Sequence, residues 1–385
     1  MKKPLLIIIV ILAVILALPV VNMIRWVFQE KKPIGIIVLD KTAPTLKREN
    51  HRSFMWILTN ERFVKAENNK SYSYAKDYYG WYPLKPLRDR AYMKKEYRLT
   101  ELIDLAEKND ALYFTDTYGV FFNDWYQGRN ARSRRSRKLY GGLNNNDYLL
   151  LSEMKKRDKL VVLEYNTIDY PTADLEKYKV EELLGIKTSG WTGKYFKSLD
   201  TLSADFPLWM TSMYRKQYKA PWRFTKPGVV ILNNKEIIVL EEGTQLVHAK
   251  PFIITSQEYS NRFGLIDSVS FEKWFSIIDP KSNNVISEFK LETSALGDSL
   301  LALNFLSASF PAVVQDSLKE RTYYFAGDFA NNDLPFWSSM FQNIEKLKGF
   351  LYTDKPDDDR QFFWLYYRPL ITGVFGEYYK SLKDQ

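Results

Sequence analysis

Residues 159–166 read KLVVLEYN, and the four consecutive apolar residues of this stretch run directly into Glu164. A short apolar run of this kind is typical of a strand that is buried on both faces of a sheet. A helical pattern that begins at Asn146 or Asp147 ends at Lys156 just before it, and another over residues 172–184 follows it. This alternation predicts a parallel sheet with helices on both faces.

Three further runs repeat the pattern elsewhere in the chain. Residues 34–39 (IGIIVL) end at Asp40, residues 111–115 (ALYFT) end at Asp116, and residues 322–325 (TYYF) lead to Asp328. We expect additional helices over residues 51–63 and 99–108, and helical, aromatic segments over residues 336–351 and 362–382. The aromatic, proline-broken residues 77–87 predict a loop.

The middle of the chain has a different pattern. Residues 228–232, 237–240 and 246–249 are short apolar runs separated by turn residues, which predicts hairpins. Residues 271–278 and 285–291 predict a further antiparallel pair. The predicted fold class is therefore α/β, with a mainly parallel, flavodoxin-like sheet, flanking helices, and an antiparallel β insertion or second lobe.

The first residues of the chain predict an attachment to a membrane. Residues 4–24 carry no charge, and a helix of this length, at about 1.5 Å per residue, crosses a hydrocarbon core of roughly 30 Å. A cleaved signal peptide is the alternative, but no small-residue cleavage site follows the run. Trp26 and Phe28 stand where interfacial aromatic residues belong. We expect a single-pass anchor in the cell membrane, with the bulk of the chain outside the cytoplasm.

Composition excludes several kinds of chemistry. The chain has 385 residues and no cysteine, so it can form neither a disulfide nor a catalytic thiolate. His51 and His248 are the two histidines, and no zinc-type spacing, phosphate-binding loop or dinucleotide fingerprint occurs. We therefore predict neither a metal nor a cofactor. Aromatic residues make up 16% of the chain, which indicates either an aromatic core or stacking surfaces for sugar rings.

Much of the formal net charge of +9 is gathered in one polar stretch, residues 127–138 (QGRNARSRRSRK). This stretch has no apolar period and predicts a surface loop. The candidate anion-binding residues are Arg129, Arg132, Arg134, Arg135, Arg137 and Lys138. Anionic headgroups and an acidic polysaccharide are possible partners, and a loop that only meets solvent is the plain alternative. An extracytoplasmic location argues against nucleic acid.

The order of elements from residues 111–116, through Gly141-Gly142 and residues 159–166, to residues 184–186 resembles the class I glutamine amidotransferase-like fold. Residues 322–332 (TYYFAGDFANN) are similar to a strand end in the amidotransferase-like domains of certain accessory proteins. These proteins serve gliding-motility ABC transporters and are also tethered to membranes. The nucleophilic cysteine of active members corresponds here to Glu164 or Tyr165, and the histidine partner is also missing. The resemblance implies the fold without amidotransferase activity, because no thiolate means no thioester.

This resemblance completes the predicted domain organisation. We expect an N-terminal tail and transmembrane anchor over residues 1–32 and an amidotransferase-like domain over residues 33–200. A β-rich insertion or second lobe follows over residues 201–320, and residues 321–385 supply a returning strand and C-terminal helices.

Acidic residues follow each of the four predicted strands, namely Asp40, Asp116, Glu164 and Asp328. Because the carboxyl ends of parallel strands meet at one edge of a sheet, these residues are candidate ligand-binding groups there. Paired carboxylates can hydrolyse glycosidic bonds, and Asp116 and Glu164 are the catalytic candidates. A structural role in capping turns and helices is the alternative.

Two other residues extend this candidate binding site, and the combined features suggest two functions. Asn166 lies at the same edge, and Trp191 is a possible sugar platform in a turn over residues 190–193. The first hypothesis is a membrane-anchored, non-catalytic accessory protein of an envelope complex, such as polysaccharide export or ABC-type machinery, that binds a partner or glycan. The alternative is an envelope enzyme that acts on glycans.

Overall fold

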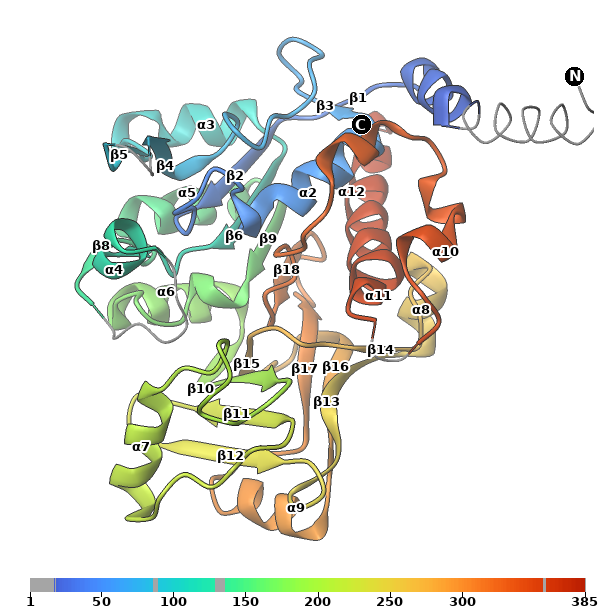
Figure 1. The fold of residues 1–385 in the computed structure, drawn as a ribbon. Helices are drawn as coiled ribbons and strands as arrows, with labels where there is room; N and C mark the ends of the chain where they lie inside the picture. The colour runs from blue at the N-terminus through green and yellow to red at the C-terminus, as the bar shows by residue number, and fades with distance from the viewer. Residues whose placement is uncertain (1–16, 18, 86–88, 129–135, 356–357, 385) are drawn as a thin grey trace, which may run out of the picture.

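A computed structural model describes residues 17, 19–85, 89–128, 136–355 and 358–384 of the chain. Its centre is a ten-stranded sheet with the order β14–β13–β16–β17–β18–β9–β6–β2–β4–β5 (Figure 1). The strands are β2 (Ile36–Asp40), β4 (Tyr79–Lys85), β5 (Ala91–Lys95), β6 (Ala111–Asp116), β9 (Leu160–Glu164), β13 (Leu246–Thr255), β14 (Ser268–Ser270), β16 (Asn284–Thr293), β17 (Ser309–Gln315) and β18 (Thr322–Phe325).

The sheet is mixed, whereas the sequence predicts a mainly parallel one. β18, β9, β6, β2 and β4 run parallel to one another, as predicted for the four strands that end in acidic residues. β17, β16, β13 and β14 then extend the sheet in antiparallel order beyond β18, and β5 does so beyond β4. Local sequence patterns give the type of a strand but not its partner, and this is why the antiparallel extension was missed.

A second, antiparallel sheet of four strands has the order β12–β11–β10–β15. Its strands are β10 (Lys187–Phe196), β11 (Gly228–Leu232), β12 (Ile237–Glu241) and β15 (Phe275–Asp279). The predicted hairpin of residues 271–278 with 285–291 is wrong, because β15 pairs with β10 while β16 pairs with β13 and β17. Residues 201–320 thus contribute strands to both sheets.

Helices cover both faces of the parallel half of the large sheet. α2 (Glu49–Asn60) and α12 (Arg368–Lys383) lie on one face, and α3 (Leu102–Lys108), α5 (Asn145–Lys156) and α6 (Asp174–Leu184) lie on the other (Figure 1). The side chain of Asn144 caps α5 by accepting a hydrogen bond from the backbone N–H of Asp147, so the predicted cap position was two or three residues late. α6 ends at Leu184, as predicted, and Gly185 follows it in the left-handed conformation.

The remaining elements are short. They are β1 (Lys32–Pro33), β3 (Phe63–Val64), η1 (Leu99–Glu101), β7 (Val120–Phe121), α4 (Phe122–Tyr126), β8 (Lys138–Tyr140), η2 (Tyr165–Thr167), α7 (Trp209–Tyr218), α8 (Gln257–Phe263), α9 (Ala295–Ala302), η3 (Phe336–Met340), η4 (Ile344–Lys346), α10 (Lys348–Leu351), α11 (Arg360–Phe362) and η5 (Phe363–Tyr367). Residues 336–351, expected to be helical, therefore form three short turns instead of one helix.

Two predicted irregular segments are strands in the structure. The loop predicted over residues 77–87 contains β4, which pairs with β2 at Asp40. Gly80 is required there, since its φ is 127° and a Cβ at this position would lie 1.8 Å from the Asp40 carbonyl oxygen. The turn predicted at residues 190–193 lies within β10, where the pairing with β15 is irregular between Thr188 and Thr192.

Most of the apolar run over residues 4–24 lies outside the described residues. Among the residues that are described, no helix is long and apolar enough to cross a membrane. Residues 19–28 are helical, and Trp26 at their end is buried, with its Nε1 donating to the Thr59 carbonyl at 3.0 Å. Trp26 therefore packs against the folded domain, whereas the sequence predicts that it lies at the membrane interface.

Candidate functional site

A cleft of about 410 Å³ opens at the carboxyl edge of the parallel strands, between this edge and the second sheet. One wall comes from the ends of β6 and β9 and from the turn after β18. The other wall comes from β10, the start of α7, the turn between β11 and β12, and Trp274. Its lining includes Asn50, Asp116, Tyr118, Tyr165, Asn166, Asp169, Lys177, Trp209, Trp274 and Asp328.

Asp116 is held rigidly at the floor of the cleft. Its Oδ1 accepts hydrogen bonds from the Thr42 hydroxyl at 2.7 Å and the Tyr118 backbone N–H at 2.6 Å. Its Oδ2 accepts from the side-chain amides of Asn50 at 3.2 Å and Asn166 at 3.1 Å. Three of these donors, Thr42, Asn50 and Asn166, come from distant segments of the chain, so the position of the carboxyl group depends on the tertiary fold.

Burial, and then the nearby charges of Asp328 and Asp40, raise the pKa of Asp116 to about 7. A carboxyl group with this pKa is present in both protonation states near neutral pH, and it can then donate or accept a proton. Of the predicted carboxylates, Asp116 is the one whose environment is most suitable for proton transfer at the cleft.

Asp328 and Asn166 also line the cleft, as the position of their strands predicts. The backbone N–H of Asp328 donates to the Trp274 carbonyl at 2.9 Å, and Phe275 bridges to Gly327. The second sheet is therefore hydrogen-bonded directly to the turn that carries Asp328. This contact fixes both walls of the cleft relative to each other.

Asp169, which the sequence analysis did not select, is buried at the side of the cleft near Lys177. Its Oδ1 lies 3.6 Å from Lys177 Nζ. Burial raises the pKa of Asp169 to about 6, although the positive charge of Lys177 opposes this shift.

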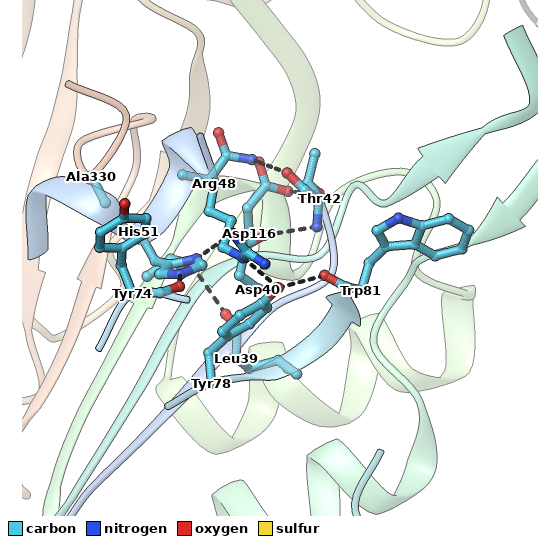
Figure 2. A network of polar contacts seen from close by, with 12 residues as sticks. Leu39, Asp40, Thr42, Arg48, His51, Tyr74, Tyr78, Trp81, Asp116 and Ala330 are labelled. Carbon is cyan, nitrogen blue, oxygen red and sulfur yellow. Dashed lines mark hydrogen bonds and ion pairs between the residues drawn. The ribbon is translucent and has the colours of Figure 1, made fainter. Parts of the chain in front are cut away.

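Asp40 lies below the cleft instead of lining it. It is buried, its Oδ1 accepts from the Thr42 N–H at 2.7 Å, and its Oδ2 lies 2.6 Å from His51 Nδ1 (Figure 2). The other ring nitrogen of His51 lies 2.8 Å from the Tyr74 carbonyl oxygen. Asp40 therefore serves the packing of α2 against the sheet, so its predicted ligand-binding role is not supported by its position.

Glu164 is also sealed inside the protein. Its Oε1 accepts from the Tyr113 hydroxyl, and its Oε2 accepts from the backbone N–H groups of Phe329 at 2.9 Å and Ala330 at 3.2 Å. Burial raises the pKa of Glu164 well above its ordinary value. Because Glu164 fastens the turn after β18 to β9, it is out of reach of a ligand in the cleft. The structure thus separates the predicted pair Asp116 and Glu164.

Aromatic rings make up much of the remaining lining. Tyr118, Tyr165, Trp209 and Trp274 belong to it, and Lys194 lies over the Trp274 ring at 5.8 Å from its centroid. Trp191, the aromatic residue selected from sequence, is only 7% exposed and belongs to the hydrophobic core. Its side chain packs inside because β10 continues through the expected turn.

Only part of the arginine-rich stretch is described. Arg129, Arg132, Arg134 and Arg135 lie outside the described residues, while Arg137 and Lys138 are exposed at the start of β8. Ser136, just before them, lines the cleft. The predicted binding of an anionic partner by this stretch therefore stays a prediction.

No cluster of three or more histidine or acidic side chains suited to a metal ion occurs among the described residues. The structure adds Asn50, Tyr118, Asp169 and Trp274 to the site, and sequence reasoning missed them. Asn50 lies in the first turn of α2, and Trp274 immediately precedes β15, the strand whose pairing was wrongly predicted. Neither position carries a local sequence signal for a cleft.

Comparison with known proteins finds no matching family model and no matching curated protein. Three solved structures match, each at 9% identity. The alignment with a β-galactosidase from Bacillus circulans covers 80% of this chain but only 30% of the β-galactosidase chain, with a TM-score of 0.32. The alignment with a ThuA-like protein from Bacteroides uniformis covers 86% of this chain and 97% of that protein, with a TM-score of 0.36. The alignment with a ThuA-like protein from Parabacteroides merdae covers 90% of this chain and 91% of that protein, with a TM-score of 0.38.

ThuA-like proteins have a glutamine amidotransferase-like fold, which is the fold that the sequence resemblance implies. All three TM-scores are nevertheless below 0.5, so these matches carry no argument about this chain. The resemblance to accessory proteins of transporters stays a prediction.

Proposed function

We propose that this protein is a membrane-anchored, non-catalytic accessory protein of a cell-envelope system, and that it binds a glycan in the cleft beside Asp116. The observation that carries the binding part is the composition of the cleft lining. The lining combines the aromatic side chains of Trp209 and Trp274 with the carboxyl and amide groups of Asp116, Asn166 and Asp328. Sugar rings offer an apolar face for stacking and hydroxyl groups for such polar side chains.

The membrane part of the proposal rests on the uncharged run over residues 4–24. The accessory part rests on the chemistry that the chain lacks and on the position of Glu164. Amidotransfer is excluded because the chain has no cysteine. Hydrolysis by the pair Asp116 and Glu164 is disfavoured because Glu164 is buried by Tyr113 and the turn after β18.

A second candidate function, a glycan-hydrolysing enzyme, is favoured by one specific observation. The pKa of Asp116, which burial and the charges of Asp328 and Asp40 raise to about 7, is suitable for a general acid. Asp328 lines the same cleft and is the candidate for the second carboxylate, in place of Glu164.

A glycan array with the full-length protein in detergent tests binding, and calorimetry then measures the affinity of the best ligand. The test variant is Asn166→Ala, which removes a cleft amide, and the matched control is Asn304→Ala, which lies outside the cleft lining. We expect the affinity to fall for Asn166→Ala and not for the control. If no envelope glycan binds, the binding proposal is wrong. Release of reducing sugar that Asp116→Asn abolishes would establish the enzyme instead.

The accessory role has its own experiment. We expect that affinity purification of the full-length protein from detergent-solubilised membranes recovers a synthase, transporter or export subunit in stoichiometric amount. Recovery of this chain alone, at detergent concentrations that preserve known envelope complexes, contradicts the accessory role while leaving glycan binding intact.

A further inference from the structure

Residues 336–351, here called the η3–α10 segment, expose several large apolar side chains. Trp337 is 62% exposed, Leu347 is 43% exposed and Phe350 is 87% exposed. Apolar residues scattered singly on a surface need no explanation, but these three belong to one short segment of a protein whose other aromatic residues are mostly buried.

The η3–α10 segment lies beside the end of the apolar run. The backbone N–H of Gln342 donates to the Asn22 carbonyl at 3.3 Å. The helical residues 19–28 expose apolar side chains next to it, including Val20, Ile24 and Phe28. Figure 1 shows α10 on the same side of the domain as the helix that carries these residues, whereas α9 lies at the opposite end.

Hydrogen bonds from α2 hold the first part of the η3–α10 segment in place. Trp56 Nε1 donates to the Ser338 hydroxyl at 2.9 Å, and the Asn60 amide donates to the carbonyls of Ser339 at 3.1 Å and Phe341 at 3.0 Å. Ile344 is buried in the core. These contacts hold the backbone of residues 338–341, directly after Trp337, against α2.

Charge at the η3–α10 segment is suited to an anionic surface. Lys346 and Lys348 are exposed on either side of Leu347. The acidic neighbour, Glu345, lies 3.3 Å from Arg368, which also pairs with Glu61 at 3.1 Å. Lysines beside aromatic and aliphatic side chains are typical of segments that lie in the headgroup region of a bilayer.

We propose that the η3–α10 segment is a second membrane contact, which rests on the bilayer surface with Phe350 and Trp337 among the lipid headgroups. The occupant is a lipid bilayer that contains anionic lipid. This inference rests on the anchor in the proposed function, and it adds that the domain is seated in one orientation instead of hanging from a tether. Two attachment points, the anchor and the η3–α10 segment, restrict how the cleft can face its surroundings.

The absence of native cysteine allows a direct test with the full-length chain. In the variant Phe350→Cys, the introduced thiol is labelled with an environment-sensitive fluorophore. The labelled protein is then reconstituted in vesicles of phosphatidylcholine and phosphatidylglycerol, which also contain a lipid with a quencher at headgroup level. The matched control is Phe305→Cys, since Phe305 is 98% exposed and follows α9 at the opposite end of the domain. We expect emission at position 350 to shift to shorter wavelength and to be quenched, and emission at position 305 to do neither.

Each outcome separates this inference from the proposed function. If the protein fails to float with the vesicles, the anchor itself is wrong, and the inference falls with it. If the protein floats but the probe at position 350 is quenched no more than the probe at position 305, the second contact is wrong and the anchor stands. Combining Lys346→Glu with Lys348→Glu should reduce the quenching at position 350 in the anionic vesicles, and unchanged quenching would contradict the electrostatic part of the inference.

Discussion

Two layers of acidic side chains occupy the same edge of the large sheet and have different surroundings. The cleft layer, Asp116 and Asp328, lines an open cavity next to amides and aromatic rings. The buried layer, Asp40 and Glu164, is covered by α2 and by the turn after β18. All four residues follow parallel strands and look equivalent in the sequence.

The comparison shows that a sheet edge does not make a carboxylate functional by itself. Glu164 is covered because Phe329 and Ala330 fold back over β9 and donate their N–H groups to it. Asp116 is only 4% exposed, but its carboxyl group lies in the lining of the cleft. We therefore expect substitutions in the buried layer to lower stability, and substitutions in the cleft layer to change pH dependence and binding.

The largest expected effect is that of Glu164→Ala. Removal of the carboxylate leaves the N–H groups of Phe329 and Ala330 unpaired and creates a cavity, so the free energy of unfolding should fall by on the order of 4 kcal/mol. Urea unfolding measures this loss.

Glu164→Gln is the matched control, because it keeps the volume and an acceptor for the two N–H groups. We expect this variant to retain most of the stability. Equal, small losses in both variants would mean that Glu164 does not hold the turn after β18, and the distinction between the two layers would fail.

His51→Leu should destabilise the protein somewhat less, by about 3 kcal/mol. The substitution leaves the buried Asp40 carboxyl group without its partner at 2.6 Å, while the Thr42 N–H still donates to it. The double variant with Asp40→Asn should recover part of the loss, because an amide tolerates burial better than an unpaired charge. Additive losses in a double-mutant cycle contradict a direct pairing of these two side chains.

The cleft layer should instead respond to pH. The pKa of Asp116 is raised from 3.8 to about 7 in the folded protein, so the folded state binds more protons than the unfolded state between these values. Stability contributed by this group is therefore lost as pH rises, by about 2 kcal/mol between about pH 5 and pH 7. Unfolding measured across this range should show a decline that is smaller in Asp116→Asn, while Asp169 and Glu164, whose pKa values are also raised, continue to contribute. The same slope in both proteins would contradict the raised pKa.

The four parallel strands, their acidic ends and the convergence of Asp116, Asn166 and Asp328 could be predicted from sequence, because short apolar runs and their order report local structure well. The division into two layers could not, since it depends on contacts such as Phe329 with Glu164 that join distant segments. For the same reason Trp191 was selected although it is in the core, and Trp274 was missed because the partner of β15 is not encoded locally.

The smallest expected effect is that of a substitution at Trp274 in the cleft lining. Trp274→Ala should weaken glycan binding by about 1 kcal/mol, roughly fivefold in affinity, because one stacking face of the cleft is lost. Trp337→Ala is the matched control, since Trp337 is exposed but is not part of the cleft lining. Calorimetry with the best ligand from the array measures both affinities. Unchanged affinity in Trp274→Ala would remove the aromatic wall from the binding site, and the cleft layer would then have to bind a ligand through its polar groups alone.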